Sequence, residues 1–242
     1  MKIFLIPPRV FLPALMVWLF LSSVSTVFDN LNDLNEKSAI MLEEKVQLPS
    51  PDRKGEISLE ETLRDRRSVR SYLDDPLELN QVSQLLWAAQ GITLEAREFR
   101  TAPSAGATYP LEVYIAAGKV NGLQSGLYRY VPADHSLVMV GETDIRNDLA
   151  AAALGQNHVR RAPAVIIISA DYDRTAQRYG DRAPRYVHME AGHAGQNISL
   201  QAVARGLGTV MVGAFEDNKV KSVLDLPPNE DPLYIIPVGK PD

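Results

Sequence analysis

Two short stretches carry most of the information in this 242-residue chain: Arg66-Arg67-Ser68-Val69-Arg70 and Thr101-Ala102-Pro103-Ser104-Ala105-Gly106-Ala107. The first places three guanidinium groups and a hydroxyl within five residues. Arginine binds phosphate groups through two parallel charge-assisted hydrogen bonds. The second stretch is a turn of small residues against which a planar ring could rest. Together they predict a site for an anionic ligand with a flat aromatic head.

The arginine stretch also has a simpler interpretation. Its side chains could form a solvated basic surface that pairs with the nearby Asp65, Asp74 and Asp75. Exposed ion pairs of this kind are common and contribute little to stability. The stretch alone leaves both interpretations open.

Composition limits the class of protein. The length fits one domain with appendages, and the net charge of −5 argues against general nucleic-acid binding, because proteins that bind polyanions are usually basic. The absence of cysteine excludes disulfides, thiolate catalysis and cysteine-ligated metals. We therefore expect a globular domain without general affinity for nucleic acids and without cysteine-based chemistry.

The N-terminus predicts export. Lys2 and Arg9 accompany an uncharged run from Val10 to Leu21, and small residues follow it. This order is typical of a signal peptide, and a run extended to Phe28 is long enough for a membrane anchor. We expect residues 1–28 to be one of the two, so that the domain is periplasmic, extracellular or anchored outside. Residues 29–55 are expected to form a polar linker, and residues 56–242 the folded domain.

The domain is predicted to be α+β. Ser58 and Glu61 form a capping box, Asn80 can begin a second helix, and the longest helix should run from Arg185 to Arg205 before Gly206. Residues 92–110 are expected to form a long functional loop. Helices and strands do not alternate regularly, so we expect a mixed, mainly antiparallel sheet with helices on both faces. The expected strands are residues 111–117, 126–131, 136–140, 164–170, 209–214 and 233–238.

Several common sites are poorly supported. Gly206-Leu207-Gly208 follows a helix and opens a strand, which reverses the order of a dinucleotide-binding turn, and no P-loop sequence is present. His188 and His193 are five residues apart, so they face different sides of a helix and no metal site is expected. No Gly-x-Ser-x-Gly context surrounds Ser68 or Ser104, which argues against a serine hydrolase.

Six segments, taken in order, resemble the nitroreductase-like flavoproteins and specifically their SagB/ThcOx-type dehydrogenase branch. The resemblance extends from about Ser58 to Gly239. The segments are Arg66–Arg70, Leu85–Gly91, Pro103–Glu112, Gly126–Tyr130, Glu190–Asn197 and Gly206–Gly208. No single segment is decisive, but six in the right order are specific.

The resemblance implies a nitroreductase-like fold, an interlocked homodimer and one FMN in each of two interfacial pockets. Hydride would pass through flavin N5, with NAD(P)H as one electron donor and a small molecule as the substrate. The membrane would be contacted only through the N-terminal segment. The cofactor-binding residues that it implies are Arg66, Arg67, Ser68, Arg70, Pro103, Ser104, Ala105, Gly106, Val212, Gly213, Ala214 and Lys240.

Two departures from the family pattern affect its interpretation. Azoline oxidases of this branch carry a Lys-Tyr pair before the long helix, and the matching pair here is Arg178-Tyr179. Arginine stays protonated and cannot act as a base, whereas Tyr179 could still donate a proton as the catalytic residue or could merely pack. Many members also carry basic residues after the last strand, where this chain has Lys240.

Three functions remain open from the sequence. The favoured one is an FMN-dependent oxidoreductase that transfers hydride to or from a small organic substrate. The second is an azoline (thiazoline or oxazoline) dehydrogenase of a peptide-modification pathway. The third is a non-catalytic flavin-binding protein that has kept the fold.

Overall fold

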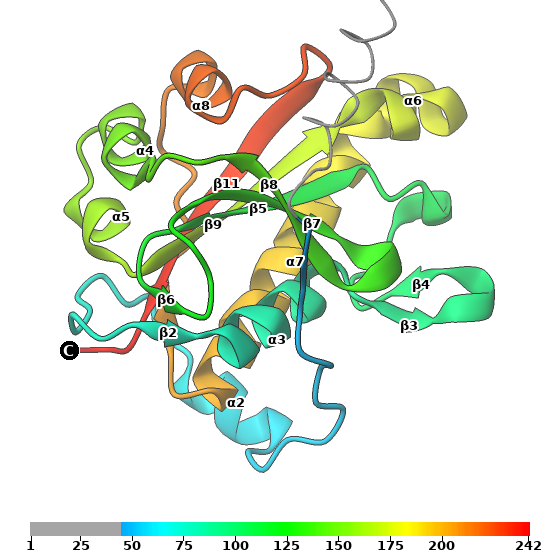
Figure 1. The fold of residues 1–242 in the computed structure, drawn as a ribbon. Coiled ribbons are helices and arrows are strands. Elements are labelled where there is room, and N and C mark those ends of the chain that lie inside the picture. The colour runs from blue at the N-terminus through cyan, green and yellow to red at the C-terminus, as the bar shows by residue number, and fades with distance from the viewer. Residues whose placement is uncertain (1–44) are drawn as a thin grey trace, which may run out of the picture. The chain divides into compact units, whose positions relative to one another are not determined.

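A seven-stranded antiparallel sheet organises residues 45–242, the part of the chain that this computed structural model describes (Figure 1). The segment expected to be a signal peptide or anchor lies outside the described residues. The strands lie in the order β1, β8, β7, β5, β9, β11 and β10. Their bounds are Lys45–Gln47 (β1), Leu111–Ala117 (β5), Gly126–Val131 (β7), Ser136–Gly141 (β8), Ala164–Asp171 (β9), Gly208–Thr209 (β10) and Glu230–Gly239 (β11).

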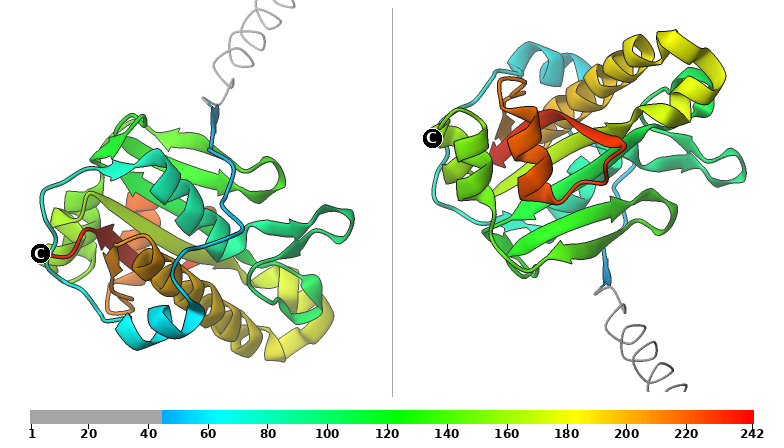
Figure 2. Two further views of the ribbon diagram at one scale, coloured as in Figure 1. Left: turned by 90° about the horizontal axis from the view of Figure 1, so that it is seen from below. Right: turned by 90° about the horizontal axis from the view of Figure 1, so that it is seen from above.

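Helices cover both faces of this sheet, and the views in Figure 2 separate the two groups. The central strand β9 shows why, because its apolar side chains alternate between the faces. Ile166 and Ile168 pack with α3 and α7, whereas Val165 and Ile167 pack with α4, α5 and α8. The helices are α2 (Leu59–Asp65), α3 (Leu79–Gln90), α4 (Arg146–Ala152), α5 (Asn157–Arg161), α6 (Tyr172–Tyr179), α7 (Ala183–Ala204) and α8 (Asp217–Leu224). The predicted α+β fold with helices on both faces is confirmed.

Short elements complete the fold. The expected loop of residues 92–110 contains a hairpin, β3 (Ile92–Leu94) with β4 (Phe99–Arg100), and a single helical turn, η2 (Ala105–Ala107). β2 (Leu77–Glu78) pairs in parallel with β6 (Val120–Asn121). The other single turns are η1 (Glu95–Arg97), η3 (Pro132–Asp134) and η4 (Gly180–Arg182).

The expected helix starts are close to those observed. Ser58 caps α2 with both hydrogen bonds of the capping box, as predicted. Helix α3 begins at Leu79, because Glu78 and Gln81 form the capping box there instead of Asn80. Helix α7 is followed by Gly206, as predicted from the sequence.

The expected linker differs from the structure in residues 45–55. Residues 45–47 form strand β1, which pairs with β8 at the edge of the sheet. Leu48 follows and is 3% exposed within the core. The amide of Asp52 donates to Gln84 Oε1 over 2.8 Å, and Gln84 Nε2 donates back to the Asp52 carbonyl over 3.0 Å. Residues 45–55 are therefore docked on the domain rather than forming a tether.

Candidate functional site

The arginine stretch lies between α2 and β2 and is held by its backbone. Ser68 forms a parallel bridge with Thr209, and the Val69 amide donates to the Thr209 carbonyl over 2.9 Å. A Cβ on Gly208 would lie 2.6 Å from Val69 Cγ2, so only glycine lets the two backbones approach. Residues 66–70 are thus fixed to β10, next to the C-terminal end of α7.

The acidic neighbours of this stretch are bound to other cations. Asp65 pairs with Arg64, Asp74 with Lys119 and Asp75 with Lys240. Within residues 45–242, neither Arg66 nor Arg70 has a carboxylate partner. The pairing with these aspartates that the simpler interpretation expects is therefore not seen for Arg66 and Arg70 in the described chain, whereas Arg70 is exposed to solvent, as that interpretation expects. Unpaired guanidinium groups on a fixed backbone are suited to an external anion.

The remaining arginine of the stretch is used differently. Arg67 Nη1 donates to the carbonyls of Arg64 and Arg66, over 2.8 Å in each case. Its side chain is exposed, like Ser68 and Arg70, whereas Arg66 is half-buried. Arg67 thereby steadies the turn that leads from α2 into the stretch.

The C-terminal segment lies beside the same stretch. The Leu73 amide donates to the Lys240 carbonyl over 3.0 Å, and Lys240 Nζ lies 2.9 Å from Asp75 Oδ2. The predicted phosphate ligand Lys240 is therefore near the arginines, with its ammonium group in an ion pair.

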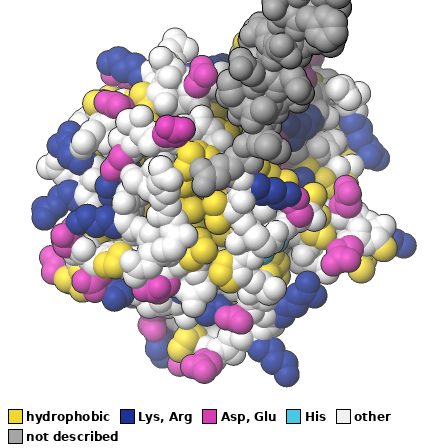
Figure 3. Space-filling model, in the orientation of Figure 1, with side chains coloured by type: hydrophobic (Ala, Val, Ile, Leu, Met, Phe, Trp, Pro, Cys, Tyr) yellow, Lys and Arg dark blue, Asp and Glu magenta, His cyan; other side chains and the backbone are white. Residues whose placement is uncertain are grey.

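A histidine that the sequence did not single out also lies here. Burial, and then the positive charge of Arg70, lower the pKa of His158, and its Nε2 atom is buried without a partner among the described residues. His158 belongs to α5, on an edge of the molecule where Lys and Arg side chains gather in Figure 3. His158 and Arg70 are far apart in the sequence, so the sequence alone does not indicate that they interact.

The predicted ring-binding loop has a constrained backbone. Gly106, Ala107 and Tyr109 all have positive φ angles, of 61°, 53° and 45°. Such angles are uncommon outside glycine, and they cluster at ligand-binding and active sites. The Ser104 hydroxyl stabilises the turn by accepting a hydrogen bond from the Tyr109 amide over 2.9 Å. Ser104 and Ala105 are half-buried, while Pro103 and Gly106 are exposed.

Helix α6 brings the Arg178-Tyr179 pair against this loop. Arg178 Nη1 donates to the Gly106 carbonyl over 3.1 Å. A Cβ on Gly106 would lie 2.7 Å from the Tyr179 hydroxyl oxygen. The Tyr179 ring also packs edge-on against Tyr186, with centroids 5.0 Å apart. The predicted catalytic tyrosine and the predicted ring-binding loop are therefore neighbours within one chain.

A buried carboxyl lies under the loop. Glu190, on α7, is 2% exposed, and burial raises its pKa to about 7 although the Ser104 hydroxyl and the charge of Arg100 oppose the shift. Its Oε1 atom has no partner within the described residues. Arg100 lies with its guanidinium carbon 4.3 Å from the centre of the Tyr109 ring. Sequence reasoning used Glu190 only as part of a motif.

The predicted strand end at residues 212–214 lies at another place along the sheet. Val212 is buried and forms a bridge with Ile235, whereas Gly213 and Ala214 are exposed. Gln156, just before α5, donates to the Ala214 carbonyl over 2.9 Å. Residues 212–214 and α5 are thus joined on the side of the sheet that carries α4 and α8.

The loop and the arginine stretch lie at different levels of α7. Ser199 Oγ lies 3.4 Å from Thr209 Oγ1 beside the arginine stretch, and Glu190, whose pKa the Ser104 hydroxyl lowers, comes nine residues earlier on the same helix. Nine residues correspond to about 13 Å along the helix axis.

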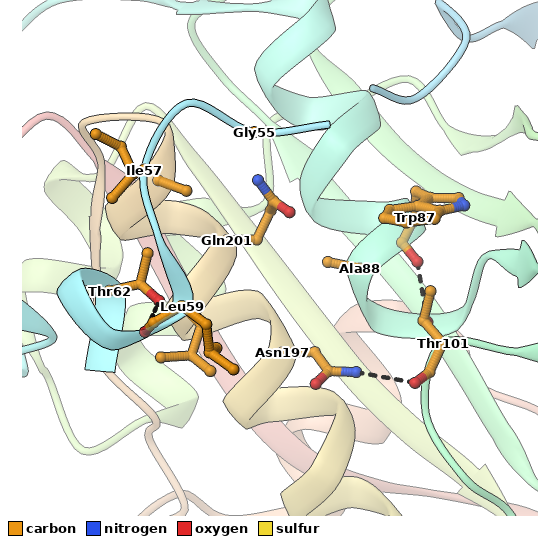
Figure 4. A pocket seen from close by; sticks show the side chains of 11 residues that line it. Gly55, Ile57, Leu59, Thr62, Trp87, Ala88, Thr101, Asn197 and Gln201 are labelled. Carbon is orange, nitrogen blue, oxygen red and sulfur yellow. Dashed lines mark hydrogen bonds between the residues drawn. The ribbon is translucent and has the colours of Figure 1, made fainter. Parts of the chain in front are cut away.

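A cavity of about 360 Å³ lies between the segment that leads into α2, α3 and α7 (Figure 4). Asn197 Nδ2 donates to the Thr101 carbonyl over 3.4 Å at one side of it, and the Thr101 hydroxyl donates to the Trp87 carbonyl over 3.0 Å. Its lining includes none of the residues predicted to bind the cofactor. It is bordered, however, by Thr101, the first residue of the second stretch, and by Thr62 in α2, which leads into the arginine stretch.

In the described part of the chain, every helix is too short or too polar to span a bilayer. Over the same residues, no group of three or more histidine, aspartate or glutamate side chains is arranged around a common metal position. His188 Nε2 lies 2.7 Å from the Tyr172 hydroxyl, and Glu190 is buried on another side of α7.

Comparisons with known proteins show the family to which the chain belongs. The model of the family described as "Nitroreductase family" matches residues 63–240. A Methanocaldococcus jannaschii protein named as a candidate nitroreductase is 49% identical over 196 residues, which are 81% of this chain and 96% of that protein. The NAD(P)H FMN reductase of Bacillus subtilis is 25% identical over 194 residues, which are 74% of this chain and 64% of that enzyme.

A solved structure shows the same fold. The crystal structure of a candidate nitroreductase from Ralstonia eutropha JMP134 has a TM-score of 0.74 and 30% sequence identity. The match covers 83% of this chain and 90% of that chain. Family model, relative and fold all agree, and the chain belongs to the nitroreductase family.

Proposed function

We propose that this nitroreductase-family oxidoreductase binds FMN and transfers hydride to or from a small organic substrate. The observation that carries the proposal is the pair Arg66 and Arg70, which flank the segment attached to β10 and have no carboxylate partner among residues 45–242, while Asp65, Asp74 and Asp75 pair with other cations. A phosphate group would complete this arrangement. The named FMN reductase among the relatives supports the same cofactor.

The residues present fit FMN. Arg66 and Arg70 would bind the phosphate, with Arg67, Ser68 and Lys240 close to it. His158, whose buried Nε2 atom has no partner in the described chain, adds a polar group beside Arg70. The exposed Gly213 and Ala214 present small surfaces suited to a flat ring.

The loop would contribute from a second copy of the chain. The support is the family resemblance, and in one protomer the two segments lie at levels of α7 about 13 Å apart. A homodimer would let Pro103, Ser104, Ala105 and Gly106 of one copy reach the flavin held by the other. Size-exclusion chromatography with light scattering tests this, because a monomer that still binds FMN would contradict it.

The cofactor supplies the redox chemistry when bound, accepting and donating hydride at N5. The protein binds and orients it, excludes water and supplies protons. The Tyr179 hydroxyl is the candidate proton donor, since it lies beside Gly106 of the loop. NADH and NADPH are the electron donors to test, because the Bacillus relative is named for NAD(P)H.

The primary test is the absorbance spectrum of the full chain, followed by anaerobic titration with NADH and NADPH. We expect flavin bands that bleach with one of the two. Flavin that stays oxidised would instead support a dehydrogenase reduced by its substrate, or a binding protein. Failure to bind FMN, even after reconstitution, would refute the proposal.

A matched pair of variants tests the phosphate site. Arg70→Met should weaken FMN binding by about 10- to 100-fold, the value of a charged hydrogen bond, but leave riboflavin binding unchanged because riboflavin has no phosphate. Lys119→Met removes a nearby exposed cation that pairs with Asp74 and should change neither affinity. Equal losses for FMN and riboflavin in Arg70→Met would show a structural role instead.

The second candidate function is azoline oxidation within the SagB/ThcOx-type branch. The position of the Tyr179 hydroxyl beside Gly106 of the loop is the observation that favours it, whereas Arg178 in place of the family's lysine counts against it. It predicts that Tyr179→Phe abolishes oxidation of an azoline peptide and that Arg178→Lys is tolerated. Activity on such a peptide that survives Tyr179→Phe would argue against it.

We also propose that residues 1–28 export the domain or anchor it outside the membrane. The support is the basic start and the uncharged run from Val10 to Leu21. A C-terminal alkaline phosphatase fusion should be active. Activity of a C-terminal reporter that functions only in the cytosol would contradict the proposal.

A further inference from the structure

A small cavity of about 140 Å³ lies where strands β5 and β7 separate. The ladder between the two strands stops at the pair Tyr114 and Arg129. Beyond that pair, β5 stays hydrogen-bonded to β9 and β7 stays hydrogen-bonded to β8, so each strand is held by its other neighbour. Both strands line the cavity, together with Gln90 at the end of α3 and Arg100 on β4.

Arg100, which borders this cavity, has one edge of its guanidinium group unused. Its Nη1 atom donates to Gln90 Oε1 over 2.8 Å, and its guanidinium carbon lies 4.3 Å from the centre of the Tyr109 ring. These contacts use one edge and one face of the group. Neither Nε, which is buried, nor Nη2 has a hydrogen-bond partner among residues 45–242. Such an edge can donate two parallel hydrogen bonds to a pair of oxygen atoms.

Gln90 supplies a further unused donor. Its side chain is buried, with 1% exposed, and Arg100 can only donate, so the amide atom that faces Arg100 is the oxygen. The amide nitrogen Nε2 is buried and has no partner in the described part of the chain. Buried N–H groups without a partner are rare and cost stability, which a bound acceptor would recover. Two neighbouring side chains therefore leave donors free beside one cavity.

The charges around the cavity also favour an anion. Glu112 is the carboxylate of the lining, and it is paired with Arg174 over 2.6 Å. Arg100 and Arg129 line the cavity as well, and within residues 45–242 neither of them forms an ion pair. Glu112 and Glu190 act on Arg100 only from a distance. The lining thus carries more positive than negative charge.

We propose that this cavity binds a planar oxyanion with two acceptor oxygens, such as the carboxylate of a short organic acid or inorganic nitrate. The free edge of Arg100 would donate to two oxygens, and Gln90 Nε2 would donate to the same group. Pockets for cofactor-sized ligands have volumes of about 300 Å³ or more, so a flavin does not fit here. The lining includes none of the residues proposed to bind FMN, and the site is therefore additional to the proposed flavin site.

The test measures thermal unfolding of the full chain at neutral pH in about 100 mM sodium acetate, sodium nitrate or acetamide, with sodium chloride keeping the ionic strength constant. Acetamide has the shape of acetate but lacks its charge and its second acceptor oxygen. For a millimolar site, we expect acetate or nitrate to raise the unfolding midpoint by about 5 °C and acetamide to leave it unchanged. The anion with the larger effect identifies the source of the oxyanion. An equal rise with acetamide, or no rise with either anion, would overturn the proposal.

Three variants assign the effect to this cavity. Gln90→Glu keeps an acceptor for Arg100 Nη1 but replaces the Nε2 donor with an oxygen, so it should stay folded and lose the response to both anions. Arg100→Met removes the free edge and should weaken binding of the anion at least about tenfold. Arg97→Met removes an exposed arginine that does not line the cavity, and it should respond like the unmodified protein. A full response in Gln90→Glu, or an equal loss in Arg97→Met, would overturn the proposal.

Discussion

Glu190 and Glu230 have similar surroundings, but they differ in how fully their oxygens are bonded. They are 2% and 5% exposed, and burial raises the pKa of both. Glu230 accepts from Ser169 at one oxygen and from the Tyr114 hydroxyl at the other, over 3.3 Å in the second case. The Ser104 hydroxyl lowers the pKa of Glu190, but one oxygen of Glu190 has no partner within residues 45–242.

This difference distinguishes a carboxyl that is bonded at both oxygens from one that is not. Glu230 is used at both oxygens where β11 begins. Glu190 lies beneath a loop with positive φ angles at Ala107 and Tyr109. Unsatisfied buried polar atoms and backbone strain both cost stability, and natural proteins retain them mainly at functional sites.

The largest expected effect is that of truncating the fully bonded carboxyl. Glu230→Ala leaves the buried Ser169 and Tyr114 hydroxyls without their acceptor and opens a cavity, so we expect a loss of about 3 kcal/mol of unfolding free energy. Glu190→Ala should cost about 1 kcal/mol, because it removes a poorly paired group. Urea unfolding at pH 7 measures both. Equal losses of unfolding free energy in the two variants would contradict the proposed difference between Glu230 and Glu190.

The next effect concerns stability against pH. The pKa of Glu190 is about 7 in the folded protein and near its ordinary value when unfolded. The folded state therefore binds more protons between about pH 4.5 and 7, so this group lowers stability progressively as the pH rises through that window. Glu190→Gln removes the penalty, and at pH 8 it should be more stable than the unmodified protein by about 1–3 kcal/mol.

The two pH limits give the control for this prediction. At pH 4.5 both forms of residue 190 are neutral, so the two proteins should unfold at nearly the same urea concentration. Glu230→Gln should gain less at pH 8, because the bonds from Ser169 and Tyr114 favour the ionised form of Glu230. A Glu190→Gln gain that is constant from pH 4.5 to 8 would contradict the burial argument.

The fold was largely predictable because its signals are local. Val165 to Ile168 form a continuous apolar run, which predicts a strand covered on both faces, and Ser58 with Glu61 predicts a helix start. The docking of residues 45–48 was missed. A three-residue edge strand has almost no periodicity, and its pairing with β8 depends on residues some 90 positions away.

The site was predictable in its parts but not in its electrostatics. The arginine stretch is visible in the sequence, yet its lack of carboxylate partners depends on Lys119 and Lys240 reaching Asp74 and Asp75 across the fold. Glu190 stands in a helix where glutamate is ordinarily solvated, and only packing buries it. The sequence holds no pattern that distinguishes such a residue from a surface one.

A smaller effect tests whether packing fixes the loop above Glu190. Gly106 and Gly155 both have positive φ, but a Cβ on Gly106 would meet the Tyr179 hydroxyl at 2.7 Å, whereas one on Gly155 would meet nothing within 4 Å. Gly155→Ala should cost about 1 kcal/mol from the backbone alone, and Gly106→Ala about 2 kcal/mol. Thermal unfolding measures both. Equal losses of stability in the two variants would show that the loop and Tyr179 move apart at no energetic cost.

The smallest effect removes one hydroxyl from each cluster. Tyr114→Phe deletes a bond to a buried carboxylate and should cost about 1 kcal/mol, with a larger loss at pH 8 than at pH 5 because the bond favours the ionised form of Glu230. Ser104→Ala should cost about half as much, since Ser104 is half-buried and water can replace its bond to the Tyr109 amide. Urea unfolding at the two pH values measures both. A larger loss of unfolding free energy in Ser104→Ala than in Tyr114→Phe would show that Ser104 and its loop contribute chiefly to the stability of the fold. The proposed difference between Glu190 and Glu230 would then be contradicted.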